Sequence, residues 1–330
     1  MQVLKKLLTP SLESFIILII FSAIMWFLPY MLGIPYLQPS YPFQVFGTFT
    51  WFTLSAGWAH FIQFFCQIAI GFVLMRWCER WQLIPLRSAV PFTIGLFIMS
   101  IIAEIQFFDS RMVALLLFLL ATRDLLSMYS YNGEKVSAAF NIGFFMTCAA
   151  FFEQKYLYLL IVFVFGMVLF STFSWRTFFA LLSGILVPLF LACGIFYLSD
   201  NLDFLTVIVS QSHVYSFEQS IPLFSSDVLF SGMILLLFLI SLVSYFSVSL
   251  NFKLHVRLNF FFINLAFVLT SIWTSLFFQS VDKLLFVPIL FFILLLSFFF
   301  STNQSKFANI AFIIFIVCGL AYRVFNLIGF

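Results

Sequence analysis

A series of long apolar runs constrains the fold of this chain more than any other feature of the sequence. A helix of about 20 residues crosses the roughly 30 Å hydrocarbon core of a bilayer, and most of the runs have about that length. The apolar residues are continuous rather than alternating, which excludes strands as the spanning elements. We expect spans at about residues 14–32, 54–75, 89–106, 111–129, 136–152, 156–173, 177–199, 228–248, 258–278, 284–300 and 307–328.

The composition also indicates that lipid, rather than water, surrounds most of the chain. Of the 330 residues, 64% are hydrophobic and 8% are charged, whereas soluble domains carry about 25% charged residues. A water-soluble fold could not cover so much apolar surface. No linker-like stretch divides the chain, so residues 1–330 are predicted to form a single integral membrane domain. The predicted fold class is all-α, a polytopic bundle of about eleven transmembrane helices, with ten or twelve as alternatives.

The distribution of Lys and Arg predicts the orientation. Cytoplasmic loops of membrane proteins carry an excess of these residues. With the N-terminus inside, eleven of the 15 basic residues fall on the inner side, and an odd number of spans puts the C-terminus outside. The inner set is Lys5, Lys6, Arg76, Arg80, Arg87, Arg123, Lys135, Arg176, Lys253, Arg257 and Lys306, and the outer set is Arg111, Lys155, Lys283 and Arg323.

Two of the expected outer connections are longer than the others. Residues 33–53 contain three prolines, flanking aromatic residues and no charged side chain, so this loop is expected to lie in the membrane interface. Residues 200–227 contain four carboxylates and no Lys or Arg. The remaining connections are too short for a soluble domain, so chemistry is expected only within the membrane or at its faces.

One outer turn gathers ionisable residues. Glu104, Asp109 and Arg111 lie within eight residues of one another, and charges at membrane depth are costly unless they have a function or a partner. The carboxylates are candidate catalytic residues, as a base or as ligands for a divalent cation, and Arg111 is a candidate substrate-binding residue. In the simpler interpretation, Asp109 caps the next helix and forms an ion pair.

Near the end of the last expected span, the charged side chain of Arg323 is expected to extend outward towards the membrane surface.

A second set of polar residues follows a helical spacing. His60, Gln63 and Gln67 are three and four residues apart, which places them on one face of the second expected helix. They are candidate substrate-binding residues, and hydrogen bonding between helices is the alternative. A lone histidine does not make a metal site.

Several functional classes are excluded. The chain has no Walker A sequence, no dinucleotide-binding glycine loop, no HExxH and no nucleophile elbow, so it is not expected to hydrolyse nucleotides or to bind a resident cofactor. The five cysteines form no CxxC pair and are expected to pack as apolar residues. A net charge of +3 without a basic tract gives no reason to expect nucleic acid.

Residues 110–200 resemble an uncharacterised family of bacterial inner-membrane proteins. The resemblance rests on a helix ending in arginine, a helix with an FxxGF pattern, and an arginine before a helix with a GxxxP pattern. The matching positions are Arg123, Phe140, Gly143, Phe144, Arg176, Gly184 and Pro188.

The same stretch is distantly similar to the middle helices of lipid-linked glycosyltransferases of the GT-C type. That similarity implies catalytic carboxylates in the first two outer loops. Glu104 and Asp109 are the counterparts in the second of these loops, whereas residues 33–53 contain no Asp or Glu.

Three functions follow as hypotheses. The first is a transferase or polymerase of the bacterial inner membrane that acts on a polyprenyl-linked sugar during assembly of the cell envelope. The second is a non-catalytic subunit or scaffold that contacts membrane lipid and other envelope proteins. The third is a transporter of a lipid or small solute, which needs a polar cavity that few residues of this chain could line.

Overall fold

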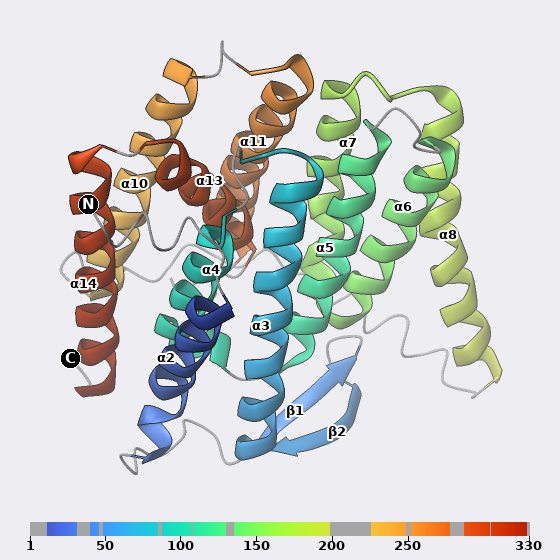
Figure 1. The fold of residues 1–330 in the computed structure, drawn as a ribbon. Helices are drawn as coiled ribbons and strands as arrows, with labels where there is room; N and C mark the ends of the chain where they lie inside the picture. The colour runs from blue at the N-terminus through green and yellow to red at the C-terminus, as the bar shows by residue number, and fades with distance from the viewer. Residues whose placement is uncertain are drawn as a thin grey trace.

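The computed structural model describes residues 12–31, 40–45, 49–84, 88–106, 108–129, 135–198, 226–248, 252–277, 287–303 and 305–328. Eleven α-helices lie in these ranges, each on one of the expected apolar runs (Figure 1). The helical fold class is therefore confirmed. The helices are α2 (Leu12–Met31), α3 (Ala56–Arg80), α4 (Val90–Ile101), α5 (Ser110–Met128), α6 (Lys135–Phe152), α7 (Leu160–Leu169), α8 (Trp175–Leu198), α10 (Ser226–Val248), α11 (Leu254–Phe277), α13 (Pro288–Thr302) and α14 (Lys306–Ile328), with 3₁₀ helices η1 (Ala103–Gln106) and η2 (Gln154–Leu159).

Six of the helices are long and apolar enough to cross a membrane, which makes the chain an integral membrane protein of the helical type. The six segments among the described residues are Gly57–Arg80, Lys135–Phe152, Trp175–Leu198, Phe230–Ser247, Leu254–Ser275 and Lys306–Phe325. The count of eleven crossings and the placement of the two termini remain predictions.

Two of the shorter helices occupy the centre of the bundle. The 12 residues of α4 extend about 18 Å, less than the hydrocarbon thickness. Eleven of them are buried, as is every residue of α13 from Pro288 to Ser301. Since other helices surround α4 and α13, their irregular ends are shielded from lipid, where unpaired backbone groups would be costly. An apolar run in the sequence does not distinguish a helix surrounded by protein from one that faces lipid.

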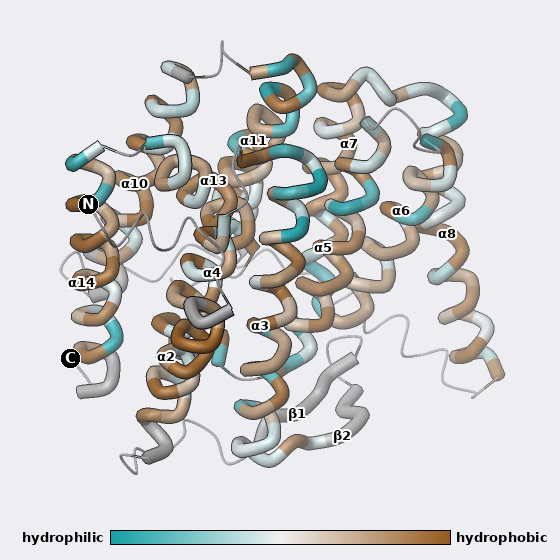
Figure 2. Tube along the Cα trace, viewed as in Figure 1, coloured by the Kyte–Doolittle hydropathy of each residue, from teal (hydrophilic) through white to brown (hydrophobic). Residues whose placement is uncertain are grey.

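The exposed flank of α8 has the opposite character. Most of α8 is exposed, and side chains such as Phe190 (80% exposed) and Leu198 (85% exposed) project away from the protein. Figure 2 shows hydrophobic residues along the length of α8 and α14, with hydrophilic residues gathered mainly towards helix ends. In water this surface would be strongly unfavourable, and in a membrane lipid covers it.

Helices α6 and α8 contact each other through their backbones (Figure 1). A Cβ atom at Gly143 would meet the carbonyl oxygen of Leu181, and one at Gly184 would meet the carbonyl oxygen of Phe140. Small residues at such crossings let the helices approach closely, which gains dispersion energy where hydrophobic driving force is absent. The two glycines of the bacterial-family resemblance therefore have a packing role.

The first long connection differs from the expected loop. Ser40–Val45 (β1) and Phe49–Ser55 (β2) pair as an antiparallel hairpin, with Ser40 opposite Ser55. Aromatic and β-branched residues favour strands, and Pro42 is tolerated because both strands of a two-stranded hairpin are edges. Of the second long connection, residues 200–225 lie outside the described part of the chain.

The close contact between α6 and α8 gives a matched pair of substitutions. We expect Gly184→Ala to lower the free energy of unfolding by about 1–3 kcal/mol, because the added methyl group is forced against the backbone of α6. A methyl group added at Gly194, on the same helix, would have nothing within 4 Å of it, so Gly194→Ala should be neutral or slightly stabilising. Thermal unfolding of both variants in detergent checks this, and equal melting temperatures would contradict the assigned contact.

Candidate functional site

A buried polar network joins α2, α3 and η1. The His60 ring approaches two backbone oxygens, with Nδ1 3.0 Å from the oxygen of Gln106 and Nε2 3.0 Å from the oxygen of Trp26. In return, Trp26 Nε1 donates to the carbonyl oxygen of His60 at 3.2 Å. A neutral imidazole donates from only one nitrogen, so an imidazolium would satisfy both carbonyls. Because both ring nitrogens face backbone oxygens, His60 is not poised to bind a metal or a substrate.

Gln106 connects this network to the last helix. Arg323 Nη2 donates to Gln106 Oε1 at 2.7 Å, and Gln106 Nε2 donates to the carbonyl oxygen of Ser100 at 2.8 Å. Arg323 is only 2% exposed, so the expectation that it extends outward is wrong. A guanidinium keeps its charge at any ordinary pH and has five donors in a fixed plane, which favours internal acceptors over distant water. The sequence analysis did not single out Gln106. The available signal was an amide side chain in the turn between two apolar runs, close to Glu104.

The three polar residues of α3 are all buried but have different partners. Gln63 Nε2 donates to the sulfur of Met112 at 3.3 Å, and Gln67 Nε2 donates to Ser22 Oγ at 2.9 Å. These contacts join α3 to α5 and α2, as the alternative of interhelical hydrogen bonding expects. The amide oxygens of both glutamines have no hydrogen-bond partner among the described residues.

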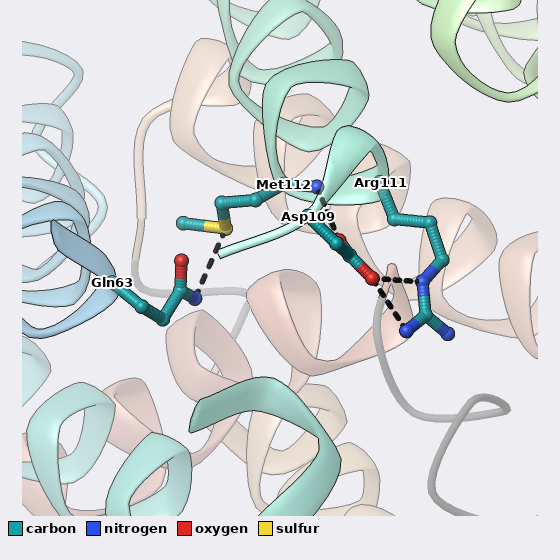
Figure 3. Close-up of polar contacts among 4 residues, drawn as sticks. All are labelled: Gln63, Asp109, Arg111 and Met112. Carbon is teal, nitrogen blue, oxygen red and sulfur yellow. Dashed lines mark hydrogen bonds and ion pairs between the residues drawn. The ribbon is translucent and has the colours of Figure 1, made fainter. Parts of the chain in front are cut away.

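Asp109 begins α5 as its N-cap. Its Oδ1 accepts from the backbone N–H of Met112 at 3.2 Å, and its Oδ2 accepts from Arg111 Nε at 2.6 Å. Figure 3 shows Gln63 pointing to the Met112 sulfur, while Asp109 and Arg111 lie towards the other side. The cap and the ion pair of the simpler interpretation are both present. Each oxygen of Asp109 already has a donor, but a carboxylate has about four acceptor sites, so further acceptor capacity remains.

Glu104 cannot be placed in this arrangement. Its backbone belongs to η1, but its side chain lies outside the described residues. The pairing of Glu104 with Asp109 as catalytic carboxylates therefore remains a prediction. Among the residues whose surroundings are described, no three His, Cys, Asp or Glu side chains are grouped closely enough to hold a metal ion.

Glu153 is a further carboxylate at this end of α5, and the sequence analysis did not single it out. It lies between α6 and η2, and burial raises its pKa above the ordinary 4.5. Lys155 and Arg111 oppose that rise in the pKa, whereas the charge of Asp109 adds to it. The signal in the sequence was a lone Glu in a short connection between apolar runs, opposite the turn that contains Asp109.

A partly open apolar pocket of about 340 Å³ lies between α2, α4 and α14. Its walls include Leu18, Phe97, Phe315 and Ile316, together with the hydroxyl-bearing Ser22 and Ser100. None of the six candidate site residues is among its described walls. The pocket is nevertheless linked to them, because Gln67 donates to Ser22, and Gln106 donates to the carbonyl oxygen of Ser100.

The raised pKa of Glu153 predicts a pH-dependent stability. The folded protein holds the Glu153 proton more tightly than the unfolded chain does. The free energy of unfolding therefore falls as the pH rises from the ordinary pKa of glutamate to the raised pKa of Glu153. At pH values above the raised pKa, the loss in free energy of unfolding is constant. Glu153→Gln should remove this loss and raise the melting temperature at neutral pH. Melting curves in detergent from about pH 4 upward check this; parallel pH profiles for both proteins would contradict it.

The two buried glutamines with different partners give a second stability test. Gln106→Leu removes an acceptor from the buried guanidinium of Arg323, and we expect it to destabilise the protein by about 1–3 kcal/mol. Gln63→Leu removes only a weak contact to sulfur and an unsatisfied oxygen, so it should be near neutral. Chemical or thermal unfolding in detergent compares them, and an equal loss in both would show that the network has no special role.

Compared with family models, curated proteins and solved structures, the chain has no match in any of the three. The two resemblances described above therefore remain predictions, and function must be argued from the geometry of the described residues.

Proposed function

We propose that this protein binds a lipid-linked substrate, with its hydrocarbon chain in the pocket between α2, α4 and α14 and its polar head group near Arg323. The setting we infer is a bacterial inner membrane, and the substrate class is a polyprenyl-linked sugar used in assembly of the cell envelope. The single observation that carries the proposal is an apolar pocket one hydrogen-bonded residue away from a buried arginine.

The pocket suits a hydrocarbon chain. Its volume of about 340 Å³ is within the usual range for ligand sites, roughly 300–1,000 Å³. No charged side chain is among its described walls, and α14, which supplies Phe315 and Ile316, belongs to one of the six potential spans. A chain taken from the surrounding lipid would exchange one apolar environment for another, so shape rather than the hydrophobic effect would select it.

The polar network supplies an end for the head group. Ser100 lines the pocket and accepts from Gln106, which in turn accepts from Arg323. Arg323 is seven residues beyond Ile316, about 10 Å further along α14. A guanidinium is well suited to a phosphate, since it offers parallel donors and a fixed positive charge.

Transferase activity would add a reaction at the same end of the molecule. Asp109 is the described candidate base, Glu104 is its predicted partner, and a divalent cation would be needed only if these carboxylates act as its ligands. Asp109 would accept a proton from a substrate hydroxyl on a remaining lone pair, and its ion pair with Arg111 would open on substrate binding. Arg111 would then be available for a phosphate oxygen.

The second candidate, a non-catalytic subunit, is favoured by a different observation. The exposed apolar flank of α8 is uniform enough in composition to accept a neighbouring membrane helix as readily as lipid. The third candidate, a transporter, is less favoured, because the pocket between α2, α4 and α14 has apolar walls among the described residues.

Filling the pocket tests the proposed function. Ile316→Trp should block the pocket, whereas Ile313→Trp adds the same bulk to the exposed side of α14. Both variants and the wild-type protein are purified in a mild detergent, and their bound lipids are extracted and measured by mass spectrometry. We expect a polyprenyl phosphate or related long-chain lipid with the wild-type protein and with Ile313→Trp, and at least a tenfold loss with Ile316→Trp.

Equal recovery of that lipid from both variants would contradict the proposal, as would its absence from the wild-type protein. Recovery of stoichiometric partner proteins with no specific lipid would favour the non-catalytic subunit instead.

A further inference from the structure

A groove lies where α6 and α8 begin. It has a volume of about 840 Å³ and is lined by Lys135, Ser137 and Phe140 of α6 and by Arg176, Phe179 and Ser183 of α8. It lies at the opposite end of α6 from Glu153, and so at the other end of the bundle from the site discussed above (Figure 1). Nothing in the proposed function requires it.

Among the described residues, the charge of the groove is positive. Lys135 and Arg176 both line it, and no carboxylate is among its described lining residues. Neither cation forms an ion pair with a residue in the described part of the chain. Three of the other described arginines, Arg76, Arg111 and Arg123, each form an ion pair with an acidic neighbour. An anion from outside the chain would supply the missing counter-charge.

The close glycine contact fixes this pair of charges in place. Gly143 and Gly184 hold α6 and α8 together about two turns from the start of each helix, so the first turns of both helices start side by side. Both helices direct their free N–H groups towards the same end, and the partial positive charge there adds to that of the side chains. The groove therefore presents a positive field from two rigid elements.

Aromatic residues place the groove at the depth of lipid head groups. Trp175 is 76% exposed at the start of α8, and Phe179 is exposed one turn further on. Tryptophan prefers the boundary between head groups and hydrocarbon. Phe140 and Ala180 supply an apolar continuation of the groove towards the middle of the membrane.

We infer that this groove binds the head group of an anionic phospholipid, with Lys135 and Arg176 on the phosphate oxygens and Phe140 and Phe179 against the upper part of an acyl chain. The Ser137 hydroxyl lies on the same lining and is available to a further oxygen of the head group. Basic pockets between membrane helices on the cytoplasmic side are suited to such lipids. The positive charge, the aromatic rim and the apolar continuation together favour a phospholipid over a free phosphate ion.

Lipid binding to the full-length protein in nanodiscs tests the inference. Affinity is measured for phosphatidylglycerol, for zwitterionic phosphatidylcholine with the same acyl chains, and for soluble glycerol phosphate. The test variant is Lys135→Gln with Arg176→Gln. The matched control is Lys253→Gln with Lys306→Gln, which removes two exposed basic residues that lie at or just before the start of other helices and line neither the groove nor the pocket.

We expect the wild-type protein and the control to bind phosphatidylglycerol at least tenfold more tightly than phosphatidylcholine, and the test variant to lose that preference. Added salt should weaken the preference because the charges are partly exposed. Equal binding of both lipids by the wild-type protein would overturn the inference without reference to any variant. An unchanged preference in a folded test variant would also overturn it, and glycerol phosphate that binds as tightly as the lipid would assign the groove to a soluble anion instead.

Discussion

The structure depends on the exclusion of water from the interior of the helix bundle. Where water is absent, each polar side chain must find an acceptor or donor within the protein, and a charge must find several. Single hydroxyl groups solve this locally: Thr93, Thr122 and Thr147 each donate to a carbonyl oxygen one turn earlier in the chain. The buried glutamines of this protein instead reach other elements, as when Gln67 donates to Ser22 and Gln63 to the sulfur of Met112.

The His60, Gln106 and Arg323 network follows from that constraint. It joins segments that are 46 and 217 residues apart in the chain, and so ties the last helix to η1 and α3. Under the proposed function, stability and ligand binding would be coupled here, because the arginine that requires internal partners is also the group we propose for a phosphate. A bound head group would replace part of an existing hydrogen-bond network rather than occupy an empty site.

The sequence was sufficient to predict where the helices lie in the chain, but not which residues surround each helix. Apolar runs predicted all eleven described helices, because spanning length and hydrophobicity are local properties of the chain. They did not reveal that α4 and α13 are enclosed by other helices, since burial depends on contacts distant in sequence. The spacing of His60, Gln63 and Gln67 predicted one polar face, yet their partners lie on four different elements, α2, α4, α5 and η1. Asp109 as a helix cap was predictable from its neighbours, whereas the approach of Glu153 required the packing of α6 beside α5. The hairpin was missed because the three prolines and the lack of charge in residues 33–53 favoured an interfacial loop, and the strand-favouring residues around them were not weighed.

The two ends of the bundle have different roles in this account. The end with η1 and the hairpin holds a buried arginine beside an apolar pocket, and the end where α6 and α8 begin holds exposed cations beside aromatic residues. We propose a lipid ligand for both arrangements. They differ in burial, because Arg323 is buried whereas Lys135 and Arg176 are exposed.

The most direct test of the membrane environment is the accessibility of a spin label at Cys318, which is exposed near the middle of α14. The other cysteines are replaced, and collision rates with oxygen and with a water-soluble nickel chelate are measured by electron paramagnetic resonance in vesicles. A label at Cys318 should collide often with oxygen and rarely with the chelate, whereas a label introduced at Lys306, the start of the same helix, should meet the chelate freely. High chelate accessibility at Cys318 would contradict the central claim that lipid covers this surface.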